Sequence, residues 1–271
     1  MNAPTISACL ITLNEAVHLE RVLRTLDFTD EIVVVDCGST DGTLEIARRV
    51  TPKVFHHDYA GQGAQRAFAI SKATGEWILV VDADEIITPE LAGEIRRELA
   101  ANAGRSPDEQ CQGYRINRRV VFQGRLLRFG GTRRDRSLRL FHRAHGRWDP
   151  TRLVHEKAIF EGRLGTLRAP MLHFSYDDLS DYFSKFNHYT SVTARERHER
   201  GRRASLMHVW RLPYEFLRRY VFQLGCLDGY PGLLYALTAS FYAFMKYAKL
   251  YELQRLEGGP FLDQYMRRRE R

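Results

Sequence analysis

Two aspartates and a glutamate directly follow a strongly apolar run in this chain. The run covers Trp77 to Val81, and Asp82, Ala83, Asp84 and Glu85 follow it directly. A continuous Val- and Ile-rich segment predicts a strand buried on both faces, with its acids at the carboxyl edge of the sheet, where open α/β folds bind ligands. Such close acids repel unless a positive charge lies among them. Mg²⁺ suits this place, because it binds one or two carboxylates together with substrate phosphates, although a solvated strand end is the plain alternative.

Two earlier strands are predicted to bring polar residues to the same edge. Residues 31–36 form a buried strand ending at Asp36, and a turn with Ser39 leads to a helix over 43–50. Residues 6–13 form the first strand, and its end carries Thr12, Asn14 and Glu15. Neither the G-x-G-x-x-G fingerprint nor a P-loop follows a strand. We therefore expect side chains and a metal, rather than a glycine-rich loop, to hold a nucleotide.

These segments resemble a known family. The stretches ITLNE, VVVDCGSTDGT and GQGAQRAFAISKATGEWILVVDADE look like family 2 glycosyltransferases of the GT-A fold, and within them the bacterial lipopolysaccharide core glucosyltransferases. Later matches are VHEKAIFEG, LHFSY and the aromatic stretch 213–253. The resemblance implies an α/β GT-A fold, a Rossmann-like nucleotide-binding sheet flanked by helices, with a β-rich acceptor region and a helical C-terminal extension.

The resemblance also implies roles for residues of the donor site. Asp36 is expected to accept from the nucleobase, Asp82 from the ribose, and Asp84 to bind Mg²⁺ or Mn²⁺ bridging the diphosphate. The expected nucleotide-sugar site consists of Thr12, Asn14, Glu15, Asp36, Ser39, Gln65, Arg66, Asp82 and Ala83. Arg66 and Arg139 are candidates for phosphate contact, the second for an acceptor phosphate as well. Surface ion pairs are the alternative for both arginines.

Two later residues are candidates for chemistry. An inverting sugar transfer needs a carboxylate general base, and the family resemblance supports Glu156 in that role. A salt bridge to a nearby arginine is the alternative, and His155 either orients Glu156, contacts the acceptor or simply packs. His173 lies at the end of a predicted strand. In many GT-A enzymes a late histidine completes the metal site, and His173 is the candidate for that role here. The alternative is a structural histidine whose nitrogens are hydrogen-bonded within the protein.

Composition is that of an ordinary globular protein, with 44% hydrophobic and 27% charged residues among 271. The four cysteines are scattered without a C-x-x-C pair, which predicts a reducing compartment and neither disulfides nor zinc. No signal-peptide pattern precedes the first strand, so we expect a cytoplasmic protein, peripheral on the inner face of the cytoplasmic membrane.

Positive charge is concentrated in one part of the chain. Residues 115–152 contain twelve arginines and two aspartates, while the whole chain has a net charge of +8. Arginine favours bidentate binding of phosphate or carboxylate. The sequence contains no nucleic-acid-binding motif, so we do not expect nucleic acid as a partner. The expected partners are a glycolipid or another anionic acceptor and an anionic membrane surface.

Alternating elements predict the domain organisation. Strands are expected near 6–13, 31–36, 53–57 and 77–82, and helices near 17–26, 43–50, 64–73 and 89–101. We expect a catalytic domain at 1–176, with a nucleotide-sugar half at 1–101 and an acceptor half at 102–176, and a helical region at 177–271. The uncharged stretch 229–245 either lies in the lipid headgroup layer, packs internally or spans a membrane.

The function predicted from sequence is inverting, metal-assisted transfer of a sugar, glucose, from a UDP-sugar to a glycolipid such as the lipopolysaccharide inner core. Other polysaccharide or protein acceptors are open alternatives. From other classes, a sugar-1-phosphate nucleotidyltransferase would begin with a glycine-rich loop and a lysine, where this chain has Thr12 to Glu15. A non-catalytic lipid- or partner-binding protein would not need the acids at positions 82, 84 and 156.

Overall fold

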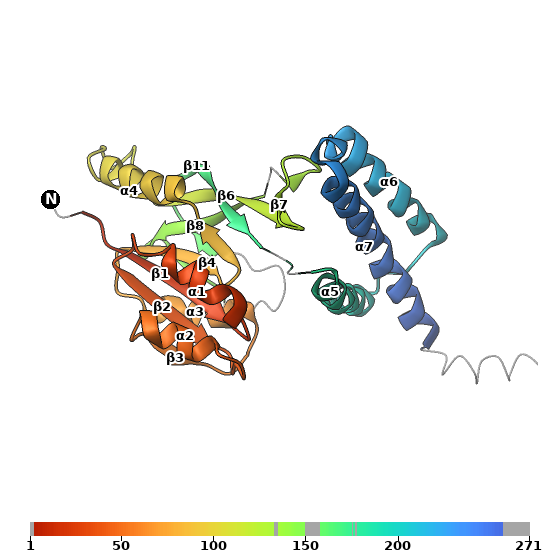
Figure 1. Ribbon diagram of the computed structural model, residues 1–271, viewed down its shortest axis with the longest axis horizontal. Coiled ribbons are helices and arrows are strands. Elements are labelled where there is room, and N and C mark those ends of the chain that lie inside the picture. The colour runs from red at the N-terminus through yellow and green to blue at the C-terminus, as the bar shows by residue number, and fades with distance from the viewer. Residues whose placement is uncertain (1–2, 133–134, 150–157, 175, 177, 257–271) are drawn as a thin grey trace, which may run out of the picture. The chain divides into compact units, whose positions relative to one another are not determined.

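The chain divides into two units according to its internal contacts. The structure, a computed structural model, describes residues 3–132, 135–149, 158–174, 176 and 178–256. The first unit comprises residues 1–120 and 134–174, and the second residues 121–133 and 175–271 (Figure 1). Residues 121–133, which the sequence groups with the acceptor half, thus belong to the helical unit.

The first unit begins with alternating strands and helices close to the expected bounds. They are β1 (Ile6–Thr12), α1 (Ala16–Arg24), β2 (Glu31–Asp36), α2 (Thr43–Val50), β3 (Val54–His56), α3 (Gln62–Lys72), β4 (Trp77–Asp82) and α4 (Pro89–Ala103). The start of α4 follows from its cap, because the Thr88 side chain accepts from Leu91 N at 3.2 Å and Pro89 suits the first turn. A short strand that the sequence did not predict, β5 (Glu85–Ile87), separates β4 from α4.

The later strands extend the same sheet. They are β6 (Gly113–Phe122), β8 (Arg136–His142) and β11 (Leu164–His173), and the strand order is β3-β2-β1-β4-β8-β6-β11-β5. The pairs among β3, β2, β1 and β4 are parallel, whereas β8 is antiparallel to both β4 and β6. A small hairpin of β9 (Gly146–Trp148) and β10 (Ala158–Phe160) forms a separate sheet. The nucleotide half and the predicted acceptor half therefore share one sheet.

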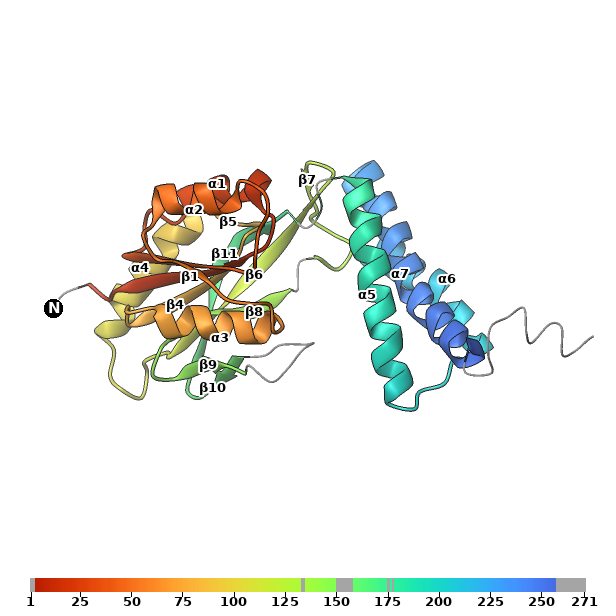
Figure 2. The ribbon, with the colours of Figure 1, turned by 90° about the horizontal axis from the view of Figure 1, so that it is seen from below.

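Helices cover both faces of this sheet, which explains why the parallel strands are apolar throughout. On one face, Ile6, Ala8 and Leu10 pack against α1, α2 and α4. On the other, Cys9 and its neighbours pack against α3 and the β9–β10 hairpin. Figure 2 shows α1 and α2 on one side of the strands and α3 on the other. Strand residues alternate between the two cores, as a period of two requires.

The second unit is helical. It contains α5 (Leu179–Glu199), the short helices η2 (Leu206–Trp210), α6 (Arg211–Leu217), η3 (Arg218–Phe222) and η4 (Gly225–Asp228), and the long α7 (Gly229–Leu256), together with β7 (Arg125–Leu126), which pairs with the end of β6. The carboxylate of Asp228 accepts from the backbone N–H of Arg128 at 3.0 Å and of Phe129 at 2.8 Å. These bonds attach the 121–133 segment to the helices.

The apolar stretch 229–245 forms the first part of α7. Its small residues Gly232, Ala236 and Ala243 are buried, and α7 packs against both α5 and α6. Much of the stretch thus packs internally. No helix among the described residues is long and apolar enough to cross a membrane.

Candidate active site at the carboxyl edge of the sheet

Two loops leave the carboxyl ends of β1 and β2 side by side. Thr12 and Asp36 are register partners at those ends. Asn14 joins the loops, because its backbone N–H donates to Ser39 Oγ at 2.8 Å and its Oδ1 accepts from Thr40 N at 2.8 Å. Asn14 has a positive φ of 55°, a conformation that asparagine tolerates better than most residues. The Glu15 backbone N–H donates to Thr43 Oγ1 at 2.9 Å and extends this connection to α2.

The Asp36 carboxylate shapes the second loop. Asp36 is fully buried and accepts from the backbone N–H groups of Gly38 and Ser39, each at 2.9 Å, and from the Ser39 hydroxyl. Gly38 has φ +100°, which favours glycine at this turn. Both sequence-predicted residues, Asp36 and Ser39, therefore hold each other in place at the strand end.

Thr12 carries a polar group without a partner. Its hydroxyl is buried at the end of β1 and has no hydrogen-bond partner within the described parts of the chain. Leaving such a group unsatisfied is costly, and an unsatisfied buried group calls for a missing partner such as a ligand. The position is the strand edge at which ligands of open α/β sheets bind.

Asp82, at the end of β4, lies between two arginines. Arg66 Nη2 is 2.6 Å from its Oδ1, and Arg139 Nη2 is 2.8 Å from its Oδ2. Burial alone would raise the pKa of Asp82, but the charges of Arg139 and Arg66 hold it well below the ordinary value. Asp82 is therefore ionised at neutral pH.

Glu85 is the buried member of the same network. It is fully enclosed, accepts from Arg139 at 2.8 Å and Arg118 at 3.3 Å, and receives the Asp82 backbone N–H at 2.9 Å. Burial raises the pKa of Glu85, and Asp82 adds to the effect while Arg139 opposes it. Sequence reasoning placed Glu85 among these acids without a role of its own and missed Arg118. The sequence analysis expected a divalent cation among Asp82, Asp84 and Glu85, whereas arginine guanidinium groups contact Asp82 and Glu85.

Asp84 is directed differently from its neighbours and lies near His173. Its Oδ2 is 3.1 Å from His173 Nε2, and its backbone carbonyl accepts from Phe174 N at 2.9 Å. The strand register explains this proximity, because β11 pairs with β5 and places His173 opposite Glu85. The structure thus brings together the two residues that the sequence singled out for a metal, 89 positions apart.

Asp84 and His173 fit a metal that arrives with its own phosphate ligands. Among the described residues, no group of three histidine, cysteine, aspartate or glutamate side chains is placed to hold an ion alone. Mg²⁺ commonly binds through one or two protein ligands, and substrate phosphates and water complete its shell. Carboxylate and imidazole are suitable donors for Mn²⁺ as well.

The remaining candidates lie around this edge. Gln65 is fully buried in α3, where its Nε2 donates to the carbonyls of His57 at 3.1 Å and Asp58 at 2.7 Å. It supports the segment after β3, while Arg66 reaches Asp82. Ala83 is buried beside them, and Arg139 is enclosed in the acidic network. His155 and Glu156 lie outside the described residues.

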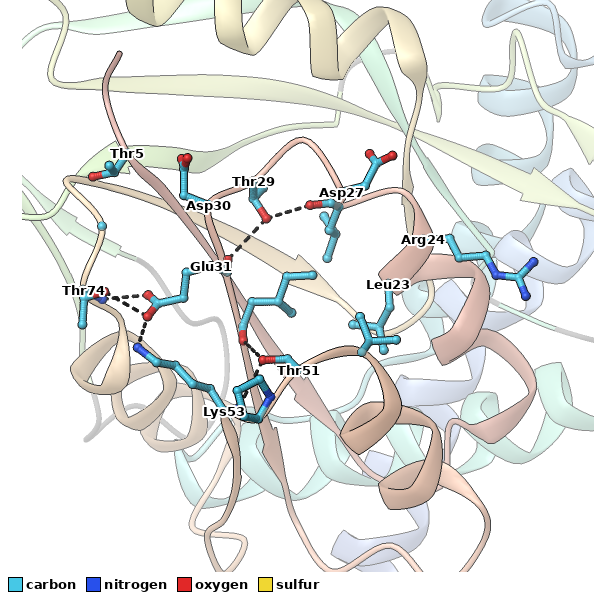
Figure 3. A pocket seen from close by; sticks show the side chains of 15 residues that line it. Thr5, Leu23, Arg24, Asp27, Thr29, Asp30, Glu31, Thr51, Lys53 and Thr74 are labelled. Atoms are coloured by element: carbon cyan, nitrogen blue, oxygen red, sulfur yellow. Dashed lines mark hydrogen bonds and ion pairs between the residues drawn. The ribbon is translucent and has the colours of Figure 1, made fainter. Parts of the chain in front are cut away.

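The opposite, amino edge of the sheet holds a depression of about 840 Å³. Figure 3 shows Glu31 there, beside Lys53 and Thr74. Burial would raise the pKa of Glu31, but bonds from Lys53, Ser7 and Thr74 lower it to about 2. Because these groups are paired with one another, we assign them to the stability of the sheet rather than to chemistry.

Comparisons with known proteins identify the family of this chain. The family model described as glycosyl transferase family 2 matches residues 7–160. A lipopolysaccharide core biosynthesis glycosyltransferase, LpsC of Rhizobium meliloti, is 31% identical over 95% of this chain and 96% of its own length. An uncharacterised glycosyltransferase of Rickettsia typhi is 28% identical over 92% of this chain and 87% of its own.

Similarity to a solved structure supports the fold. The crystal structure of residues 1–349 of TarS from S. aureus aligns with a TM-score of 0.50 at 18% identity, covering 95% of this chain and 93% of the other. The mixed sheet flanked by helices, followed by C-terminal helices, is thus a GT-A-like fold. This chain belongs to glycosyl transferase family 2.

Proposed function

We propose that this enzyme transfers glucose from UDP-glucose to a glycolipid of the lipopolysaccharide inner core, with inversion at the anomeric carbon. The observation that carries the proposal is the convergence of Thr12, Asp36, Asp82 and Asp84 at the carboxyl edge of neighbouring strands. The name of the relative LpsC supports the acceptor class. The donor and the inversion rest on the resemblance of the sequence motifs.

The donor roles proposed here are those that the sequence resemblance implies, and the geometry of the edge is compatible with them. The Asp36 carboxylate already accepts hydrogen bonds from its own loop, and its oxygens can accept one more from a nucleobase N–H. Asp82 would present an ionised carboxylate to the ribose hydroxyls. Asp84 and His173 would hold Mg²⁺ or Mn²⁺. When bound, this ion stabilises the negative charge that develops on the leaving diphosphate.

Acceptor activation is assigned to Glu156. Its carboxylate would take the proton of the acceptor hydroxyl while that oxygen attacks the anomeric carbon and the bond to the diphosphate breaks. The arginine-rich segment 115–152 would meet phosphates or carboxylates of the acceptor, although Arg118 and Arg139 are already committed to Glu85. The enzyme would meet this acceptor at the inner face of the cytoplasmic membrane.

The test is release of nucleoside diphosphate from a panel of nucleotide sugars, with Mg²⁺, Mn²⁺ or EDTA, and with or without bacterial lipid extract. We expect UDP release from UDP-glucose that requires metal and increases with lipid. Asp84→Ala should lower it about a hundredfold or more, since the ion stabilises charge formed in the transition state. Asp108→Ala, at an exposed position, is the matched control. Equal rates with EDTA, or a preference for a protein acceptor, would contradict the proposal.

A further inference from the structure

Large apolar side chains are exposed along a continuous segment of the helical unit. Between residues 206 and 230 they include Leu206, 89% exposed, Phe222, 79% exposed, and Trp210, 67% exposed. We call this segment, which covers η2, α6, η3 and η4, the 206–230 face. An exposed apolar surface of this kind marks an interaction site more often than a plain solvent surface.

Packing within the unit explains why this face is uncovered. The long helix α7 lies between α5 and α6, and α6 makes its contacts with α7 and with its own neighbours in sequence (Figures 1 and 2). The buried residues of α7 are used in this packing. In the part of the unit that the structure describes, the outward side chains of the 206–230 face have no such layer over them.

Three cations gather beside this face around one aromatic ring. The Arg197 guanidinium lies 4.3 Å from the centroid of the Tyr247 ring, that of Arg211 5.2 Å, and the Lys246 ammonium 5.9 Å. His208 stacks on the same ring at 3.8 Å. These groups come from α5, η2, α6 and α7, so the tertiary fold brings them together.

Within the described part of the chain, the cation cluster has no anion in ion-pair contact, and Glu215 acts on Lys246 only at longer range. None of its three cations forms an ion pair with any residue placed by the structure, and the nearby Glu215 is bound to Arg218 at 2.8 Å and Arg219 at 3.4 Å. Burial, followed by the charges of Arg197 and Arg211, lowers the pKa of Lys246, and the charge of Glu215 opposes this in part. An anion placed here would relieve this repulsion.

We propose that the 206–230 face docks onto an anionic lipid bilayer, with lipid phosphates at the Arg197, Arg211 and Lys246 cluster and the apolar side chains in the headgroup layer. The occupant follows from the combination of features, because an anionic bilayer presents phosphates of net negative charge directly above an apolar layer. Trp210 suits the interface, where tryptophan is enriched. The proposal deepens the glycolipid-acceptor function but is measured without turnover.

Intrinsic fluorescence provides a direct measurement of insertion. Of the three tryptophans, Trp77 and Trp148 are buried at 6% and 7% exposure, so a change on adding vesicles reports Trp210. With the full chain, we expect a blue shift and co-sedimentation with phosphatidylglycerol vesicles, and neither with phosphatidylcholine vesicles. Lipids with bromine on the upper acyl chain should quench the emission.

Paired variants separate the charged and the apolar contributions. Arg197→Gln/Arg211→Gln should weaken vesicle binding about 25-fold, since each cation near an anionic surface contributes about fivefold. Leu206→Ser/Phe222→Ser should abolish the blue shift while retaining weak, salt-sensitive sedimentation. The matched controls, Arg48→Gln/Arg49→Gln and Val17→Ser/Val50→Ser, change exposed residues of the other unit and should bind like wild type.

Thermal unfolding checks that each variant is folded before binding is compared. The proposal is overturned if folded Leu206→Ser/Phe222→Ser binds like wild type, or if phosphatidylcholine binds equally well. It is also overturned if light scattering shows a dimer that this pair dissociates while vesicle affinity is absent, since the face would then bind a second copy. Vesicle binding by an enzyme that releases no UDP would refute the proposed function alone.

Discussion

At the scale of single residues, replacement of Arg139 is expected to lower stability strongly. It is buried, and one of its nitrogens contacts both Asp82 and Glu85 at 2.8 Å. Arg139→Met keeps much of the volume but leaves the enclosed Glu85 carboxylate with Arg118 as its one remaining ion-pair partner among the described residues. Removing one partner of a buried ion pair costs about 3–5 kcal/mol, which we expect as the loss in unfolding free energy by chemical denaturation at pH 7.

The pH dependence of that loss distinguishes a charge effect from a packing effect. Burial raises the folded-state pKa of Glu85, so its ionised form is penalised above its unfolded pKa and the penalty disappears as protonation becomes complete. The deficit of Arg139→Met should therefore shrink as the pH falls from 7 towards 4. Arg136→Met, exposed on the same strand, should stay within about 0.5 kcal/mol of wild type. A deficit independent of pH would indicate lost packing instead.

At the scale of elements, Gly232 determines how closely α7 approaches η4. A Cβ at this position would lie 2.1 Å from the Gly225 carbonyl oxygen and 2.8 Å from Asp228 Cβ. We expect Gly232→Ala to lower the unfolding free energy by about 1–3 kcal/mol, because the backbone must shift. Gly93→Ala in α4 is the control, since its Cβ would meet only the flexible end of Arg97. Calorimetry should show that variant unchanged or up to about 1 kcal/mol more stable, and equal losses in both would contradict the argument.

The elements also show which parts of the fold sequence alone predicts. Strands β1, β2 and β4 were expected almost at their observed bounds, because segments buried on both faces are continuously apolar and end at polar residues. The insertion of β8 between β4 and β6 was not predictable, because pairing between distant strands leaves no local pattern. The same limit applies to the site. Asp82 and Asp84 were found from a strand end, whereas Arg118 reaches Glu85 from 33 positions away.

The apolar run of α7 illustrates a different limit. Residues 229–245 contain no charge, which raised the expectation of contact with lipid, yet many of their small residues are buried between helices. The neighbouring segment 206–228 mixes arginine with aromatic residues and shows no clear period, but it carries the most exposed apolar side chains of the unit. Burial depends on which faces the neighbouring helices cover, and hydropathy along the chain does not contain that information.

At the scale of the whole molecule, the two units are proposed to bind two chemically different partners, a nucleotide with metal and an anionic bilayer. Hydrogen exchange followed by mass spectrometry can observe each unit by itself in the intact protein. UDP with Mg²⁺ should slow exchange in residues 12–16, 36–43 and 82–85, where ligand contacts restrict opening of the loops. Phosphatidylglycerol vesicles should instead slow exchange in residues 206–228, whose short helices have few buried contacts.

Two variants test whether the nucleotide site and the membrane-binding face act independently. Asp84→Ala should lose the metal-dependent protection by UDP and keep the protection by vesicles, because Asp84 contacts His173 and lies outside the helical unit. Leu206→Ser/Phe222→Ser should show the reverse pattern. Each ligand would then stabilise its own unit independently, as expected for two sites without a shared residue. Loss of both protections in either folded variant would mean that the sites are coupled, and protection by neither ligand in the wild type would contradict both assignments.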